Sequence, residues 1–236
     1  MSSLEQNRIW SDRIISKIDT SFRHRWEIYD EIIECESKDA GIWLDLGAGD
    51  NEHIERFGHN SDTAIGMDLI FPGHHIENYV NADIKSLPIA TQTVDLITLR
   101  YVVEHIDDIE SAFSEMARIL RPGGKIIVLT TNRRNPIIAL ASIIPFGIKQ
   151  KLISSVFRVE HDDVMKTYHR LNTPERFKKG FKNLKLDEIH YISDLNYARK
   201  IVFLIYLAQH IITYPFRPMR SNIIAIYKKT DIPKGI

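Results

Sequence analysis

Apolar runs alternate with polar stretches along the middle of the chain, and the spacing predicts both strands and helices. The runs GIWLDLG, TAIGMDLI, TVDLITLRYV and GKIIVLTTN, all between residues 41 and 132, are short and continuously apolar, as buried β-strands are. Between the last two runs, apolar residues recur at helical spacing. We expect this helix to begin after the capping signal Asp107-Asp108 and to end at Pro122-Gly123-Gly124.

Strands that alternate with helices predict an α/β fold, because parallel neighbouring strands need crossover connections. We therefore expect one domain, residues 1–236, with a doubly wound and mostly parallel sheet. Residues 1–40 read as an N-terminal helical cap, and residues 135–171 read as a helical insertion within the domain. Beyond the insertion, the pattern predicts a short helix in NTPERFKKGFKN, a strand in KLDEIHYIS, a long apolar helix over 195–216 and a final strand in SNIIAIYKK.

The charge balance and the cysteine content argue against a nucleic-acid-binding protein and against a disulfide-bonded secreted one. Lysine plus arginine and aspartate plus glutamate both number 31, so the basic excess of a dedicated nucleic-acid binder is missing and we expect no nucleic-acid partner. Cys35 is the single cysteine, which excludes an intramolecular disulfide, and the polar start MSSLEQNRIWSDRIISKID is unlike a signal peptide. A cytoplasmic setting is the expectation.

Two windows, residues 135–148 and 201–216, are strongly apolar. Both are shorter than the roughly 20 apolar residues that a spanning helix needs. Peripheral membrane contact through these apolar helices remains open at this point.

The stretch IWLDLGAGDNEHI places Gly47 and Gly49 between a predicted strand and a predicted helix, as in a nucleotide-binding turn. In a dinucleotide-binding fingerprint, the third glycine position lies where Glu52 stands here, and a carboxylate beside a pyrophosphate would repel it. Asp68 ends the next strand about 20 residues farther on, where an acidic side chain can accept hydrogen bonds from ribose hydroxyls. A ribose without a phosphate therefore fits this pattern best.

Four motifs carry a resemblance and occur in the order found in one known family: LDLGAGD, IGMDL, NADIKSLPIATQTVDLITLRYVVEHIDD and EMARILRPGGKIIVLTTN. Through them the chain resembles the class I S-adenosylmethionine-dependent methyltransferases, closest to the ubiquinone/menaquinone-biosynthesis-like branch. The resemblance covers residues 42–132 and continues weakly through YHRLNTPERFKKGF to the last strand. It implies a seven-stranded Rossmann-like methyltransferase fold, with the helical lid insertion after the strand that ends near Asn132, and S-adenosyl-L-methionine as the cofactor.

The resemblance also implies which residues hold the cofactor. Backbone at the first strand's end would contact the methionine part and Asp68 the ribose. Asp83 and Ile84 would lie around the adenine, and the residues after the fourth strand near the transferring methyl. The implied cofactor-binding residues are Asp45, Leu46, Gly47, Ala48, Gly49, Asp68, Leu69, Asp83, Ile84, Arg100 and Tyr101. Asn51 stands where the family often has glycine, and asparagine tolerates left-handed backbone better than most residues.

The candidate catalytic residues are less sharply defined, because methyl transfer mainly needs alignment and exclusion of water. An oxygen acceptor would need a base, and the candidates are His105, His161, Tyr168 and His169. Glu104-His105 also recurs in the family as a structural feature at the start of a helix, which is the simpler reading of that dipeptide. No histidine, cysteine or carboxylate cluster has the spacing of a metal site, so no metal is expected.

The function predicted is methyl transfer to a small-molecule or lipid-linked acceptor, such as a saccharide or a quinone precursor. Two alternatives remain open. One is a non-catalytic or regulatory protein that binds S-adenosylmethionine, and the other is an RNA- or protein-modifying methyltransferase, although the chain reads LRYV where an NPPY-like motif would stand.

Overall fold

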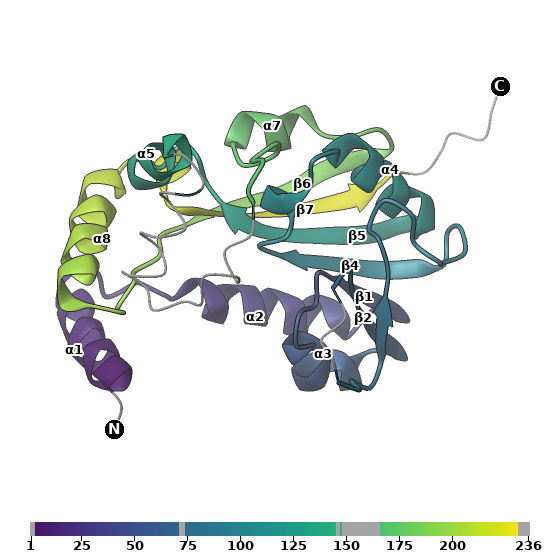
Figure 1. Cartoon of the computed structure of the whole chain (residues 1–236), viewed down its shortest axis with the longest axis horizontal. Coiled ribbons are helices and arrows are strands. Elements are labelled where there is room, and N and C mark those ends of the chain that lie inside the picture. Colours follow the sequence, from purple (N-terminus) through teal and green to yellow (C-terminus); the bar gives the residue numbers. More distant parts are fainter. Residues whose placement is uncertain (1–2, 71–73, 145–146, 148–165, 231–236) are drawn as a thin grey trace. The chain divides into compact units, whose positions relative to one another are not determined.

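The computed structural model describes residues 3–70, 74–144, 147 and 166–230 (Figure 1). Seven strands form one sheet in the order β3-β2-β1-β4-β5-β7-β6. The strands are β1 Ile42–Leu46, β2 Thr63–Asp68, β3 Tyr79–Asn81, β4 Val94–Arg100, β5 Leu120–Thr131, β6 Leu184–Ile192 and β7 Asn222–Lys229. The α-helices are α1 Ser3–Ile18, α2 Arg25–Ser37, α3 Glu52–Phe57, α4 Ile109–Ile119, α5 Pro136–Ile143, α7 Pro174–Lys179 and α8 Lys200–Thr213. The 3-10 turns are η1 Gly58–Asn60, η2 Val103–His105 and η4 Arg217–Met219.

The α/β prediction is confirmed, and the first five strands carry the part of the sheet that matters for the site. β1 pairs in parallel with β2 and β4, β2 with β3, and β4 with β5. Helices α2 and α3 cover one face of this sheet, and α4 and α7 cover the other (Figure 1). The strands nearest the centre are almost fully buried, which explains why their sequences read as continuous apolar runs.

One boundary differs from its prediction. The helix α4 begins after its cap Asp108, as expected, but it ends at Ile119, and β5 starts at once with Leu120 in extended conformation. The Pro122-Gly123-Gly124 signal therefore lies inside the strand. The ladder shows why this is possible, because pairing with β4 jumps from Leu120 to Lys125 and leaves the signal in a bulge.

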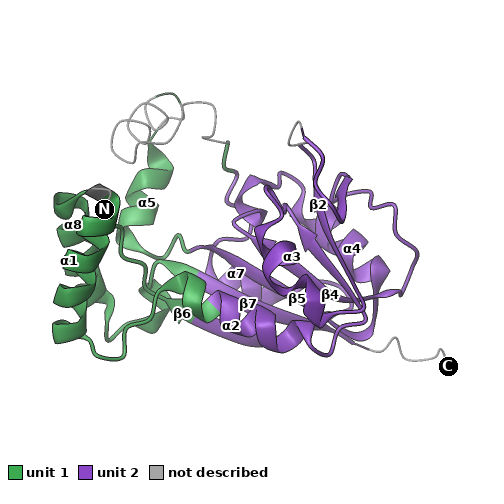
Figure 2. Ribbon diagram, turned by 90° about the horizontal axis from the view of Figure 1, so that it is seen from below, with its two compact units in different colours: residues 1–28, 132–167, 191–222 green, residues 29–131, 168–190, 223–236 purple. Residues whose placement is uncertain are grey.

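Chain contacts divide the structure into two compact units, coloured separately in Figure 2. Residues 29–131, 168–190 and 223–236 form unit 2, which carries most of the sheet, and residues 1–28, 132–167 and 191–222 form unit 1. In unit 1, α8 packs on α1 around a small core of Ile15, Leu195, Phe203 and Leu207. That the chain acts as a single domain stays a prediction.

Helical predictions for the outer segments are met in part. The cap over residues 1–40 contains α1 and α2, and α5 lies at the start of the predicted insertion. Residues 166–171 form neither helix nor strand, and most of the insertion between them and α5 lies outside the described residues. The predicted helix over 195–216 is shorter, since Arg199 is extended and the helix ends at Thr213, before Pro215. In the part of the chain that the structure describes, no helix is long and apolar enough to cross a membrane.

Candidate functional site

A sharp turn leads from β1 into α3, and two glycines make it possible. Gly47 and Gly49 both have positive φ, 75° and 54°. The backbone N–H groups of Gly47 and Ala48 both donate to Met67 O, at 2.7 and 3.2 Å, which ties the turn to the end of β2. A Cβ on Gly47 would lie 2.2 Å from Val102 Cγ2, so only glycine fits between the turn and the segment after β4.

Asp68 is the residue that the turn meets at the end of β2. Its Oδ2 accepts from Gly49 N at 3.1 Å, and its Oδ1 accepts from Ile70 N, also at 3.1 Å. A carboxylate can accept about four hydrogen bonds, so acceptor capacity remains for a ligand's hydroxyls. A Cβ on Gly49 would meet nothing within 4 Å, which shows that space above the turn is open.

The residues after Asp68 are held in an exposed position. Asn81 Nδ2 donates to Asp68 O at 3.0 Å and to Leu69 O at 2.9 Å, which fixes the chain as it leaves β2. Leu69, the residue after Asp68, is 68% exposed. An apolar side chain beside the Asp68 carboxylate can pack on the flat face of a base.

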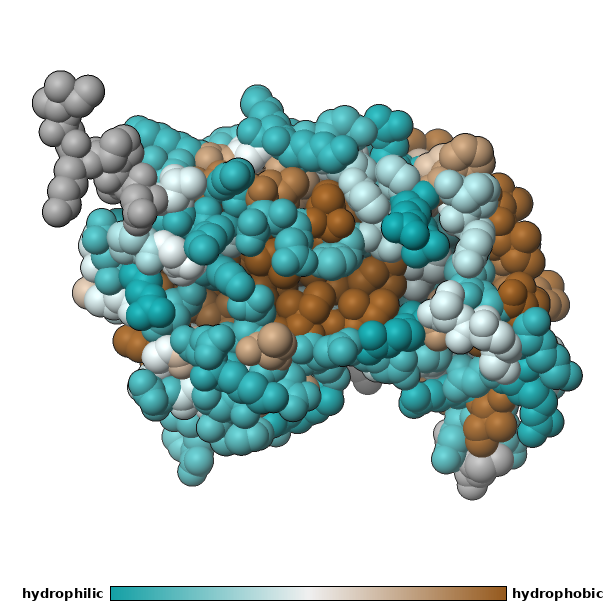
Figure 3. Space-filling view, turned by 180° about the vertical axis from the view of Figure 1, so that it is seen from behind, coloured by the Kyte–Doolittle hydropathy of each residue, from teal (hydrophilic) through white to brown (hydrophobic). Residues whose placement is uncertain are grey.

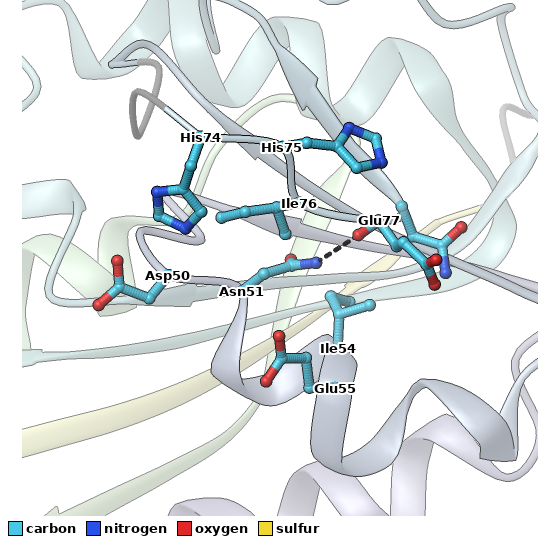
Figure 4. Close-up of a pocket in the computed structure, with 9 residues that line it drawn as sticks. Asp50, Asn51, Ile54, Glu55, His74, His75, Ile76 and Glu77 are labelled. Carbon is cyan, nitrogen blue, oxygen red and sulfur yellow. Dashed lines mark hydrogen bonds between the residues drawn. The ribbon is translucent and has the colours of Figure 1, made fainter.

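Asn51 takes the left-handed conformation that its position requires, with φ 63° and ψ 19°. Its side chain is buried and donates from Nδ2 to Glu77 O at 3.0 Å (Figure 4). Gly66 makes room for it, because a Cβ there would lie 1.9 Å from Asn51 Oδ1. The departure from the family's glycine is therefore accommodated by the backbone and by a second glycine on β2.

A hollow of about 540 Å³ lies beside the turn, between the start of α3 and residues 74–78 (Figure 4). Its lining includes the carboxylates of Asp50, Glu55 and Glu77 and the imidazoles of His74 and His75. Carboxylates repel a phosphate group at close range. None of the predicted cofactor-binding residues lines this hollow, so the prediction of a nucleoside without a phosphate stays a prediction.

Beneath the turn, the side chain of Asp45 points into the core. It is 3% exposed and accepts from Thr98 Oγ1 at 2.6 Å, while Thr98 Oγ1 accepts from Trp43 Nε1 at 2.9 Å. Burial raises the pKa of Asp45, opposed by the nearby charge of His53, whose Nδ1 lies 3.9 Å from Asp45 Oδ2. Only the backbone of Asp45 therefore faces the turn, which is the contact that the resemblance implies.

His53 links this buried carboxylate to a second one. Its Nε2 lies 3.4 Å from Asp30 Oδ1, and Asp30 also pairs with Arg56 at 2.7 Å. Burial alone would raise the pKa of Asp30, but the neighbouring His53 and Arg56 outweigh it and lower that pKa. This network, which the sequence did not reveal, fixes α3 against α2 from below the turn.

The end of β4 supplies the next two predicted residues. Arg100 Nη1 pairs with Glu52 Oε2 at 3.1 Å, so the arginine joins β4 to the first residue of α3. Tyr101 has φ 57°, uncommon for a non-glycine residue, and its N–H donates to Leu129 O at 2.8 Å. Strained backbone at the carboxyl end of a central strand is a feature of many active sites.

Asp83 and Ile84 follow β3, whose Asn81 is paired with Asp68 in the sheet. Both are half-buried, and Asp83 Oδ1 accepts from Lys85 N at 2.9 Å, which makes a tight turn. The structure thus places this predicted adenine-side turn just beyond the strand next to Asp68.

Three of the four candidate catalytic residues, His105, Tyr168 and His169, lie on two segments of backbone that are hydrogen-bonded to each other. Glu104 O accepts from Tyr168 N at 2.7 Å and from His169 N at 3.2 Å, so both lie against the turn η2 that contains His105. His161 lies outside the described residues. A catalytic role for these groups stays a prediction.

The side chain of Glu104 is buried and hydrogen-bonded in the interior. It is 4% exposed, and its Oε2 accepts from Thr130 Oγ1 at 2.7 Å; Asn172 Nδ2 donates to the same hydroxyl at 2.7 Å. This agrees with the structural reading of the Glu104-His105 dipeptide. In the sequence, Thr130 and Asn172 stand too far apart for any local pattern to join them. Among the described residues, no group of three or more histidine, cysteine or carboxylate side chains is placed to hold a metal ion.

Comparison with known proteins gives one family match and many similar structures. Residues 44–128 match the family described as "Methyltransferase domain". The ubiquinone/menaquinone biosynthesis C-methyltransferase of Haemophilus ducreyi is 32% identical over 77 residues, which cover 32% of this chain and 30% of that protein. The matched segment thus spans less than a third of that relative's length.

Solved structures share the fold over much more of the chain. A chain from the complex between the Haloferax volcanii Trm112 methyltransferase activator and the putative methyltransferase aligns with TM-score 0.62 and 15% identity, covering 99% of this chain and all of that chain. A putative S-adenosylmethionine-dependent methyltransferase from Listeria monocytogenes aligns with TM-score 0.57 and 11% identity, covering 85% and 97%. The match over residues 44–128 thus identifies a methyltransferase domain in this part of the chain, similar in sequence to a ubiquinone/menaquinone biosynthesis C-methyltransferase, and the solved structures show that the chain shares the fold of S-adenosylmethionine-dependent methyltransferases.

Proposed function

We propose that this protein transfers a methyl group from S-adenosylmethionine to a small-molecule or lipid-linked acceptor. The observation that carries the proposal is the glycine turn at β1, locked to the end of β2 and hydrogen-bonded to the carboxylate of Asp68. It presents open backbone, a ribose acceptor and an exposed leucine on one edge of the sheet.

The residues present suit this cofactor. Asp68 would accept from the ribose hydroxyls, Leu69 would contact the adenine, and the backbone of 45–49 would meet the methionine part. Glu52 stands at the third glycine position of a dinucleotide fingerprint, where its carboxylate would repel a pyrophosphate, so a nucleoside is the better fit. When bound, S-adenosylmethionine supplies a sulfonium methyl whose positive charge disappears on transfer.

The task of the protein is then to align an acceptor with that methyl and to exclude water. His105, Tyr168 and His169 gather around one turn, and one of them would hold the proton of an oxygen acceptor. A carbon acceptor such as a quinone precursor would need less help with its proton, and the C-methyltransferase named above supports that choice. A saccharide is the other acceptor that we keep.

Cofactor binding is the first test. Asp68→Ala should weaken S-adenosylmethionine binding by about 1–3 kcal/mol in titration calorimetry, since hydrogen bonds to a charged acceptor are lost. Asp68→Asn, which keeps one acceptor oxygen, should lose less. Asp187→Ala removes an exposed carboxylate of β6 in the same unit and should leave binding unchanged. If Asp68→Ala binds like the wild type, or if the wild type binds NADH but not S-adenosylmethionine, the proposal fails.

Transfer is the second test. The protein would be incubated with methyl-labelled S-adenosylmethionine and separate metabolite, lipid and RNA fractions. We expect label in a metabolite or lipid product and none in RNA. Label in RNA would favour a nucleic-acid methyltransferase, and tight binding with no labelled product in any fraction would favour a regulatory binding protein.

A further inference from the structure

The outward face of α8 is entirely apolar beyond its first residue, although helices of this kind usually expose polar groups. Ile201 is 64% exposed and Ile212 is 69% exposed. The exposed residues recur at helical spacing and form one stripe, which we call the α8 stripe: Ile201, Leu204, Ile205, Ala208, Ile211 and Ile212. At the edge of the space-filling view where α8 lies, brown side chains mark this surface (Figure 3).

The inward face of α8 carries the polar groups instead. Gln209, His210 and Thr213 are all buried, and His210 Nε2 lies 3.2 Å from Asp19 Oδ2. Phe203 and Leu207 pack with Ile15 of α1 in the unit's core. The helix is therefore firmly placed in its unit by one face, and the α8 stripe is not the face that folding uses.

Positive charge brackets the α8 stripe. Arg199 and Lys200 precede it, and Arg217 follows it, all exposed. No aspartate or glutamate occurs anywhere from residue 195 to residue 230. Two aromatic side chains, Tyr214 and Phe216, stand exposed between the stripe and Arg217, as aromatic residues do at membrane interfaces.

We propose that the α8 stripe binds the surface of a membrane that contains anionic lipid, with the helix lying in the plane of the interface. A helix of 14 residues is about 21 Å long, too short to span a bilayer but suited to lie along it. An apolar face with cationic ends is the pattern of helices that insert their apolar side among the headgroups. This inference does not depend on the transfer reaction.

A second copy of the chain fits the same surface less well. In a two-fold symmetric contact between α8 helices, the antiparallel arrangement would bring Arg199 and Lys200 near the partner's Arg217. No carboxylate in 195–230 could compensate for that repulsion. Anionic lipid compensates for it directly.

A second helix of unit 1 supports the membrane reading. α5, PIIALASI, contains no charged residue and no buried residue, and Leu140 and Ile143 are 64% and 72% exposed. It follows Arg133 and Arg134, and it lies close to α8 in both ribbon views (Figures 1 and 2). The unit thus offers more than one apolar helix to the same kind of surface.

The test is flotation of the full chain with vesicles of phosphatidylcholine alone and of phosphatidylcholine with phosphatidylglycerol. We expect stronger binding to the anionic vesicles, weakened by salt. Ile205→Ser combined with Ile212→Ser should reduce that binding by roughly tenfold or more, since two large apolar side chains are lost. The matched control, Ile9→Ser with Ile18→Ser, removes two exposed isoleucines of α1 and should bind like the wild type.

The charges are tested separately. Lys200→Gln with Arg217→Gln should reduce binding to anionic vesicles by roughly tenfold and leave binding to neutral vesicles unchanged. Should the isoleucine variant misfold, Ile212→Cys in a Cys35→Ser background, labelled with an environment-sensitive dye, gives a second readout: its emission should shift to the blue on anionic vesicles. Absence of binding by the wild type, equal losses in the α1 control, or a wild-type dimer that the isoleucine variant converts to monomer would each overturn the inference.

Discussion

Gly66 packs so closely against Asn51 that adding a single methyl group to Gly66 should disturb the turn. Gly66→Ala would place a Cβ 1.9 Å from Asn51 Oδ1 and 2.9 Å from Ala48 Cβ. Neither distance is tolerable, so the Asn51 side chain must rotate away and the turn must shift. The rotation also breaks the hydrogen bond from Asn51 Nδ2 to Glu77 O.

The magnitude follows from these two contributions. Overpacking of this kind costs about 1–3 kcal/mol, and losing the hydrogen bond adds about 1 kcal/mol. Asn51→Gly alone should cost about 1 kcal/mol or less, because the lost hydrogen bond is partly offset by relief of the left-handed backbone. With Asn51 gone, Gly66→Ala meets only Ala48, and we expect its cost to fall by about 1–2 kcal/mol, which is the coupling between the two sites.

The assay is a double-mutant cycle measured by urea unfolding, with S-adenosylmethionine affinity as a second readout. Gly66→Ala should weaken cofactor binding, and the double variant should recover part of it. Gly58→Ala serves as the control: Gly58 has helical φ, and its Cβ would make tight contacts with Ala64 and Ile54, at 3.2 and 3.3 Å, but none with Asn51, so its cost should be the same with and without Asn51. Equal costs of Gly66→Ala with and without Asn51 would refute the reasoning.

Two further predictions concern the turn and unit 1. Gly47→Ala should abolish measurable S-adenosylmethionine binding in calorimetry, because its Cβ would lie 2.2 Å from Val102 Cγ2 at a φ of 75°, and Val102→Ala should restore binding only in part. Burial lowers the pKa of His210 below 6.5 despite Asp19 at 3.2 Å, so the folded state holds fewer protons there than the unfolded state; stability should fall as pH drops from about 7 through this range, and His210→Gln should flatten that slope in urea unfolding.

The central fold was predictable because each of its signals is local. Buried parallel strands read as apolar runs, and the amphipathic spacing of α4, with Asp108 as its cap, predicts both the helix and its start. β3 was missed because Tyr79–Asn81 is short and two of its three residues are exposed. Three residues at the edge of a sheet leave no apolar run to detect.

The site was predictable as a set of motifs but not as a set of contacts. The chain order of Gly47, Gly49 and Asp68 suggested one ligand edge, and the structure brings Gly49 N to Asp68 Oδ2. The partners of Asn51 could not be found in the same way. Glu77 and Gly66 meet it through the tertiary structure, and glycine on a strand carries no sign of what it makes room for.

Hydrophobic periodicity does not predict which face of α8 is buried. Residues 201–208 are apolar almost throughout, so the pattern cannot say which side faces the core. The tertiary structure decides it: Phe203 and Leu207 face the core, and on the same side Gln209 Nε2 donates to Thr213 Oγ1 and His210 Nε2 lies 3.2 Å from Asp19 Oδ2. These partners offset part of the cost of burying the two polar side chains, while the packing of Phe203 and Leu207 with Ile15 holds this face inward. The isoleucines are then left facing outward, and a contiguous apolar surface of this kind gains free energy when another apolar phase covers it.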